Sequence, residues 1–180
     1  MPVDNRMIIL LCAILLVAFV IVFATGKVGV IKKIDAAIIF RRQMFGLYFV
    51  YILTIFVITV FSREPRTDNL PNVFIPCYEY YFIIKNGLPW YYDNMILLNV
   101  VNVALFIPYG ILAREITRKK LLFPLLSGIA VSLAIELIQL FTEVGIFDIN
   151  DIMYNVLGVL AGCGICVLCN KIRLKTGKKD

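Results

Sequence analysis

The stretch Leu121–Phe141, LLFPLLSGIAVSLAIELIQLF, decides the class of fold. A helix of this length crosses the hydrocarbon core of a bilayer, which takes about 20 apolar residues, and Glu136 is the only charged residue in it. The composition of the 180-residue chain agrees, because 61% of its residues are hydrophobic, against about 45–50% in an ordinary soluble domain. The sequence therefore predicts an all-α, polytopic membrane helical bundle and excludes a soluble enzyme.

Four further stretches have the length and composition of transmembrane helices. They are Met7–Thr25, Met44–Ser62, Met95–Leu112 and the short, glycine-rich Ile152–Leu168. The sequence therefore predicts five transmembrane helices. We expect the first to stay in place as an anchor rather than be cleaved as a signal peptide, because the basic cluster follows it and no A-x-A-like site is present.

The basic residues fall in alternate connections between these spans. Of the 18 Lys and Arg residues, fourteen lie in the loop after the first span, the loop after the third and the tail after the fifth. Because Lys and Arg collect on the cytoplasmic side of a membrane, we expect the amino terminus outside and the carboxyl terminus in the cytoplasm. The basic loops are interpreted as orientation signals, so no nucleic-acid partner is predicted.

The chain is predicted to have three parts. Residues 1–44 form an amino-terminal anchor and a basic cytoplasmic loop, residues 45–168 form the transmembrane domain, and residues 169–180 form a basic cytoplasmic tail. Residues 28–43 have two interpretations, a basic amphipathic segment on the inner leaflet or a plain positive-inside anchor.

The outer loop 63–94 is rich in tyrosine and punctuated by prolines. Aromatic rings of this kind collect at the headgroup level of a bilayer. We expect an interfacial cap that is partly helical near Tyr78–Lys85. Whether the loop binds a ligand or serves only as an aromatic belt is left open.

A carboxylate inside a span costs at least about 2.5–3.5 kcal/mol, so it is rarely there without a partner or a task. At 1.5 Å per residue, Glu136 is predicted to lie about 7 Å below the outer boundary of its span, and amides of the neighbouring spans reach a similar depth. The candidate ligand-binding residues in and beside the spans are Glu136, Gln139, Asn99, Asn102, Asp148, Asp151, Asn155 and Ser132.

Helical periodicity places these side chains on the faces where helices pack. Small or kinking residues are expected to support this packing, namely Pro108, Gly110, Gly128, Gly158 and Gly162; the Gly158-xxx-Gly162 spacing lets helix backbones approach closely, and Pro108 is expected to bend its helix. The pattern predicts a polar cavity in the outer half of the bundle. The alternative is that the amides only form interhelical hydrogen bonds, each worth about 0.6–2 kcal/mol.

Several chemistries are not predicted. Histidine is absent, which excludes imidazole zinc sites and Ser-His-Asp triads. Cys163-x-x-Cys166-x-x-Cys169 has a metal-like spacing without a fourth ligand, and we interpret it as helix packing. The five cysteines show no disulfide framework, and we expect no metal and no cofactor.

Three segments taken together resemble the VanZ-like family of bacterial membrane proteins. They are Asn102-Val-Ala-Leu-Phe106-Ile-Pro108-Tyr-Gly110, Ile135-Glu136-Leu-Ile-Gln139, and Phe147-Asp148-Ile-Asn-Asp151 followed by Asn155-Val-Leu-Gly158 and Gly162. Upstream, Arg66 with Asn72-Val-Phe-Ile-Pro76 is similar to an outer-loop element of that family. The resemblance covers about residues 45 to 165. Asn150 stands where the family commonly has an acid, and residues 143–146 lack the Arg that many members carry.

The resemblance implies an envelope role in a bacterial plasma membrane, since the namesake of the family is associated with low-level resistance to teicoplanin. The first hypothesis is a non-enzymatic protein that binds an envelope lipid or a lipoglycopeptide in the outer leaflet. Glu136 and Gln139 would contact amide or cationic groups, Asp148 and Asp151 would line the mouth, and Arg66 would balance a phosphate.

Two other hypotheses stay open. An intramembrane enzyme acting on a lipid-linked substrate would use Glu136 as a general base, with Asp148 and Asp151 holding a divalent cation; the same Asp-x-x-Asp pattern is also a common helix cap. A small transporter would need a homo-oligomer, because five helices do not form paired inverted repeats in one chain.

Overall fold

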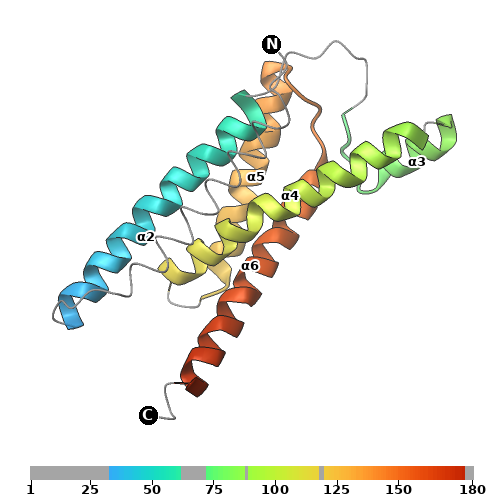
Figure 1. The fold of residues 1–180 in the computed structure, drawn as a ribbon. Coiled ribbons are helices and arrows are strands. Elements are labelled where there is room, and N and C mark those ends of the chain that lie inside the picture. The colour runs from blue at the N-terminus through green and yellow to red at the C-terminus, as the bar shows by residue number, and fades with distance from the viewer. Residues whose placement is uncertain (1–32, 62–71, 88, 118–119, 177–180) are drawn as a thin grey trace. The chain divides into compact units, whose positions relative to one another are not determined.

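The computed structural model describes residues 33–61, 72–87, 89–117 and 120–176. The regular elements among these residues are helices, and four of them are long and apolar enough to cross a membrane (Figure 1). The chain divides into two compact units, Met1–Glu64 and Pro65–Asp180. The predicted first span, Met7–Thr25, lies outside the described residues, so the count of five spans stays a prediction.

In the first unit, α2 (Lys33–Phe56) continues into a π-helical turn, η1 (Val57–Phe61). Its apolar part, Gln43–Val60, coincides closely with the predicted second span. Two threonines in it donate to their own helix backbone, as Thr59 Oγ1 does to Ile55 O at 2.8 Å. From Lys33 the helix runs unbroken into the span; residues 28–32 lie outside the described residues, so both interpretations of residues 28–43 stay open.

The second unit contains α3 (Tyr78–Asn86), α4 (Pro89–Ile116), α5 (Leu122–Thr142) and α6 (Ile149–Thr176). The helical part expected in the outer loop is α3. It ends before Gly87, whose φ of 63° is the left-handed conformation typical of a residue just after a helix. α4 then begins at Pro89, which suits a first helical position because proline has no N–H to leave unpaired there.

Two helices are longer than the sequence predicts. α4 starts six residues before Met95, and α6 extends from Ile149 to Thr176, with an apolar part, Ile149–Ile172, of 24 residues. The prediction of a short fifth span is therefore wrong. Hydropathy identifies only the uncharged, apolar part of a helix. The backbone hydrogen bonds of the same helix continue into the polar residues on either side of that part.

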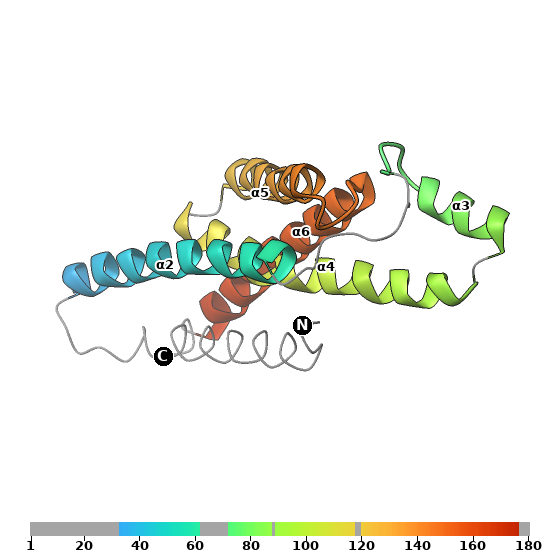
Figure 2. The ribbon, with the colours of Figure 1, turned by 90° about the horizontal axis from the view of Figure 1, so that it is seen from above.

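α4 and α6 cross each other (Figures 1 and 2) and form the most extensive helix–helix contact of the second unit. Glycines permit this contact, because a Cβ at Gly158 would overlap the carbonyl oxygen of Val103, and one at Gly162 would overlap that of Ile107. The later glycine of α6, Gly162, lies against the later residue of α4, Ile107. The two helices therefore run in the same direction.

α5 runs opposite to its neighbours. Its Glu136 meets Asp148 before the start of α6, and its Gly128 lies against Val159 further along α6. In Figure 2, α6 starts near α5 and passes across α4. The three helices therefore alternate in direction, as successive membrane crossings must.

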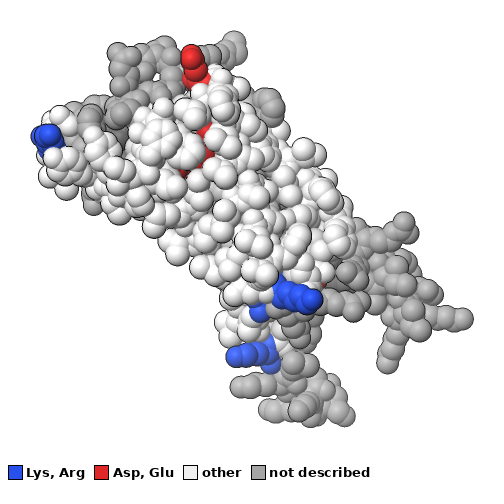
Figure 3. Space-filling view, turned by 180° about the vertical axis from the view of Figure 1, so that it is seen from behind, with Lys and Arg blue, Asp and Glu red and all other residues white. Residues whose placement is uncertain are grey.

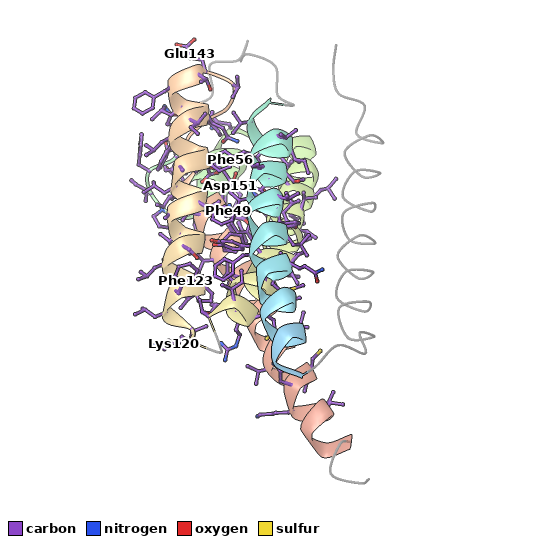
Figure 4. The ribbon with its side chains drawn as sticks, turned by 90° about the vertical axis from the view of Figure 1, so that its left-hand side faces the viewer. Phe49, Phe56, Lys120, Phe123, Glu143 and Asp151 are labelled. Carbon is purple, nitrogen blue, oxygen red and sulfur yellow. The ribbon has the colours of Figure 1, made fainter. Side chains whose placement is uncertain are left out.

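Charged side chains separate toward the two ends of this unit. We call the end where α5 ends and α6 begins the acidic end, and the end where α4 and α6 end and α5 begins the basic end. Among the described side chains, the acidic end holds Glu136, Glu143, Asp148 and Asp151, and the basic end holds Arg114, Lys120 and Lys171. Figure 3 shows the two kinds apart, and Figure 4 shows Lys120 and Glu143 at opposite ends of α5. Glu115 at the basic end and Lys85 at the end of α3 depart from this pattern.

Large apolar side chains cover the outside of these helices. Leu97, Leu126, Leu157 and Leu168 are each more than half exposed. Soluble monomers rarely expose apolar surface along whole helices, whereas a lipid-facing surface requires it.

Candidate functional site

The buried face of α5 carries most of its polar groups. The buried residues of this helix are Pro124, Gly128, Ser132, Ile135, Glu136 and Gln139. They recur at intervals of three and four residues, which is the period of one helix face. The face that helical periodicity marks in the sequence is thus the face that α5 buries.

Glu136 is buried (1% exposed) and accepts a hydrogen bond through Oε2 from the backbone N–H of Asp148 at 2.7 Å. Asp148 directly precedes α6, so the carboxylate lies beside the amino-terminal end of a helix, where the unpaired N–H groups and the macrodipole stabilise negative charge. The acid thereby fixes the α5–α6 connection to the buried face of α5.

Asp148 caps α6. Its Oδ1 accepts hydrogen bonds from the backbone N–H of Asn150 at 2.8 Å and from Asn150 Nδ2 at 2.9 Å. Asp151 in the first turn is half-buried and adds negative charge at the same helix end. The Asp-x-x-Asp pattern therefore has the geometry of a helix cap, and no group of three or more Cys, Asp or Glu among the described residues is placed to hold a metal ion.

The segment before α3 is tied to the α5–α6 connection by backbone and side-chain hydrogen bonds. Val73 forms a parallel β-bridge with Asp148, in which Val73 N donates to Phe147 O at 2.7 Å and Ile149 N donates to Val73 O at 3.0 Å. Asn72 Oδ1 accepts from Phe147 N at 2.9 Å. These bonds fix the segment before α3, which belongs to the outer loop, against the α5–α6 connection at the acidic end.

Asn150 completes this tie. Its Oδ1 accepts from the backbone N–H of Cys77 at 2.8 Å, while its Nδ2 donates to Asp148. Cys77 has a left-handed φ of 63°, a conformation that a residue other than glycine adopts at some cost, and Asn150 supports it. An amide is needed at position 150 because one of its atoms accepts and the other donates to a carboxylate.

A second polar pair lies one turn deeper. Asn155 Nδ2 donates to Ser132 Oγ at 2.8 Å, joining α6 to α5. Ser132 precedes Glu136 by four residues and Asn155 follows Asp151 by four, so both sit one helical turn from the acids. Asn155 is 4% exposed, and its Oδ1 is fully buried without a hydrogen-bond partner.

A third polar group joins α3, α4 and α6. The hydroxyls of Tyr80 and Tyr154 lie 2.6 Å apart, and Asn99 Nδ2 donates to Tyr80 Oη at 3.2 Å. Asn99 therefore contacts Tyr80, whereas Glu136 is bonded to Asp148 N and Asn155 to Ser132. The interhelical hydrogen bonds that the sequence left as an alternative are present for Asn99, Asn155 and Ser132.

The remaining candidates are placed as follows. Gln139 is buried on the same face as Glu136, and Asn102 is half-buried. Pro108 is buried inside α4, which continues to Ile116, and Gly110 packs against the backbone of Val159. Arg66 lies outside the described residues. The polar cavity remains a prediction.

Four polar residues of these networks were missed as site candidates, namely Asn72, Asn150, Tyr80 and Tyr154. Asn72 was marked only as the first residue of the 72–76 element. Asn150 was marked only as an amide at a position where the family commonly has an acid. Tyr80 looked like one more ring of the aromatic loop 63–94, and Tyr154, within the predicted fifth span, carried no signal.

An all-helical chain with several membrane-crossing helices and polar side chains buried between them is a multi-pass membrane protein. The chain belongs to the VanZ/LLP1 family, whose model matches residues 47–170, from α2 into α6. The resemblance found in the sequence is thereby confirmed. No curated protein and no solved structure matches the chain.

Proposed function

We propose that this protein binds, without converting it, the headgroup of an envelope amphiphile at the acidic end of its second unit. The ligand would be an envelope lipid or a lipoglycopeptide such as teicoplanin, and the protein would act in glycopeptide resistance or envelope homeostasis. The observation that carries the proposal is the buried Asn155 Oδ1, which has no hydrogen-bond partner and lies on α6, the helix whose start is bonded to the buried carboxylate of Glu136. Leaving such an atom unpaired costs about 1–3 kcal/mol.

The site favours a headgroup that donates hydrogen bonds. Asn155 offers an acceptor, and the acids at the start of α6 and opposite it, Glu136, Asp148 and Asp151, attract ammonium, hydroxyl or amide N–H groups.

The proposal places the acidic end on the outer side of a bacterial plasma membrane, in a chain of five spans with its amino terminus outside. The separation of charges supports this orientation, because Lys and Arg collect on the cytoplasmic side. Exposed apolar side chains at the acidic end, among them Phe74, Tyr81 and Phe141, suit the headgroup level of a bilayer.

Native mass spectrometry of the purified full chain tests the proposal. We expect a co-purified lipid whose occupancy falls in Glu136→Gln. Gln retains an acceptor for Asp148 N, so the variant removes the charge while keeping the hydrogen bond. The matched control is Glu115→Gln at the basic end, which should leave this occupancy unchanged. Equal occupancy in wild type and Glu136→Gln would contradict the proposal.

A cellular test separates the two kinds of ligand. Wild type and Glu136→Gln are expressed in a susceptible Gram-positive host, and sensitivity to teicoplanin is compared with sensitivity to vancomycin. Protection against teicoplanin alone that depends on Glu136 would identify a lipoglycopeptide ligand. A lipid adduct without such protection would favour an envelope lipid.

A further inference from the structure

The basic end contains a second polar group, which the proposed function does not use. Cys166 Sγ on α6 donates to Glu115 Oε1 on α4 at 3.3 Å, and Asn170 Nδ2 donates to the same oxygen at 3.4 Å. Asn170 Nδ2 also lies 3.5 Å from Cys166 Sγ. Glu115 is thus engaged by α6, although Arg114 is its neighbour in the chain.

Arg114 is the member of this group whose bonding is incomplete. It lies within the candidate span Ile96–Ile116 and is half-buried, and its Nε is fully buried without a hydrogen-bond partner. Cys163 interacts with the Arg114 side chain through a hydrogen bond and through its charge, but a sulfur is only a weak acceptor, and Nε keeps no partner. A guanidinium N–H shielded from water therefore lacks the strong acceptor that it would have in solvent.

The surroundings of Arg114 indicate the chemistry of a missing acceptor. Lys120 and Lys171 are exposed at the same end, so the local charge is positive. Leu122 and Leu168 are exposed apolar residues of the neighbouring helices, as on a surface that faces lipid. An acceptor here has to be anionic and has to lie at a membrane boundary. Phosphate meets both conditions, and a guanidinium binds it through parallel hydrogen bonds.

We propose that Arg114 binds the phosphate group of a membrane lipid at the basic end, between the ends of α4 and α6. Lys120 attracts the anion over a longer range, and Arg114 supplies the directed hydrogen bonds. This site is separate from the one at the acidic end, so either can fail while the other stands.

The test uses the full chain purified in detergent and titrated with phosphatidylglycerol or with phosphatidylcholine of the same acyl chains, read by native mass spectrometry. Arg114→Gln removes the charge, Arg114→Lys keeps the charge but removes Nε, and Lys171→Gln removes an exposed charge at the same end. We expect phosphatidylglycerol affinity to fall about tenfold in Arg114→Gln, by an intermediate factor in Arg114→Lys, and less than about twofold in Lys171→Gln.

Three results would overturn the proposal. One is unchanged phosphatidylglycerol affinity in Arg114→Lys, which also decides the matter if Arg114→Gln folds poorly. Another is an equal loss in Lys171→Gln and Arg114→Gln, which would indicate unspecific attraction. The last is inorganic phosphate competing as well as the lipid does, which would mean that the site takes the free anion.

Discussion

The two ends of the second unit accommodate buried polar groups differently. At the acidic end, Glu136, Asp148 and Asn150 each accept a hydrogen bond from a backbone N–H, so the side chains are bound to a connection of fixed conformation. At the basic end, Glu115 is held by a thiol and an amide at 3.3 and 3.4 Å, and Arg114 Nε has no partner. The acidic end is therefore bonded mainly to the backbone of the chain, and the basic end mainly to other side chains.

The difference indicates what each end contributes to stability. A backbone N–H that loses its acceptor stays buried and unpaired, whereas a side-chain donor can turn to another partner. Substitutions at the acidic end should therefore cost more than matched substitutions at the basic end. The free energy of unfolding is measured in detergent by circular dichroism as sodium dodecyl sulfate is added.

The largest effect is expected at the crossing that separates the two ends. Gly162→Ala places a Cβ against the carbonyl oxygen of Ile107, and backbone atoms have to move, so we expect a loss of about 3 kcal/mol. Gly164→Ala is the control, because nothing lies within 4 Å of a Cβ there. If both variants were equally stable, the close approach of α4 and α6 would not hold the unit together.

The next largest loss of stability is expected from the glutamate of the acidic end, Glu136, compared with Glu115 at the basic end. Glu136→Ala leaves the N–H of Asp148 buried and unpaired and should cost about 2 kcal/mol. Glu115→Ala frees only side-chain donors, so a smaller loss is expected. Glu136→Gln should retain most of the stability because it still accepts the bond. An equal loss in the two alanine variants would remove the distinction between the ends.

Each end also has an asparagine that donates a hydrogen bond to a carboxylate, Asn150 at the acidic end and Asn170 at the basic end. Asn150→Asp replaces the Nδ2 donor by an oxygen 2.9 Å from Asp148 Oδ1, and we expect repulsion worth about 1.5 kcal/mol. Asn170→Asp makes the same change opposite Glu115, where the distance is 3.4 Å, and should cost less. The loss in Asn150→Asp should shrink at low pH, where carboxylates are protonated. A loss independent of pH would point to a different cause.

The smallest effect is expected from the thiols of the basic end. Cys166→Ser keeps a hydroxyl donor for Glu115 in a similar volume, so the change should stay below about 1 kcal/mol. Cys163→Ser, whose sulfur donates to Gly110 O at 3.5 Å, is the companion variant. A loss as large as that of Glu136→Ala would show that the thiols do more than fill space.

Features that depend on local periodicity could be predicted from the sequence. The buried face of α5 follows from the spacing of Gly128, Ser132, Glu136 and Gln139, and the glycine spacing of α6 marks where α4 comes near. The family assignment rested on the same short segments.

Features that depend on distant pairing could not be predicted. Cys77 and Asn150 are 73 residues apart, and Phe147 and Asn72 are 75 apart, so nothing in either segment reveals the other. The predicted depth of a polar side chain within the membrane also did not show which residue it would bond to. Asn99, Glu136 and Asn155 were expected at one level, but each forms its own hydrogen bonds with different residues.

The bond from Asp148 to Glu136 spans only twelve residues of chain. During synthesis the carboxylate can therefore accept this hydrogen bond as soon as the following turn has emerged, before α4 and α6 have docked. An isolated α5 would enter lipid with a bare carboxylate, whereas a hairpin of α5 and the start of α6 would not. Biogenesis should consequently favour joint release of these two helices from the insertion machinery.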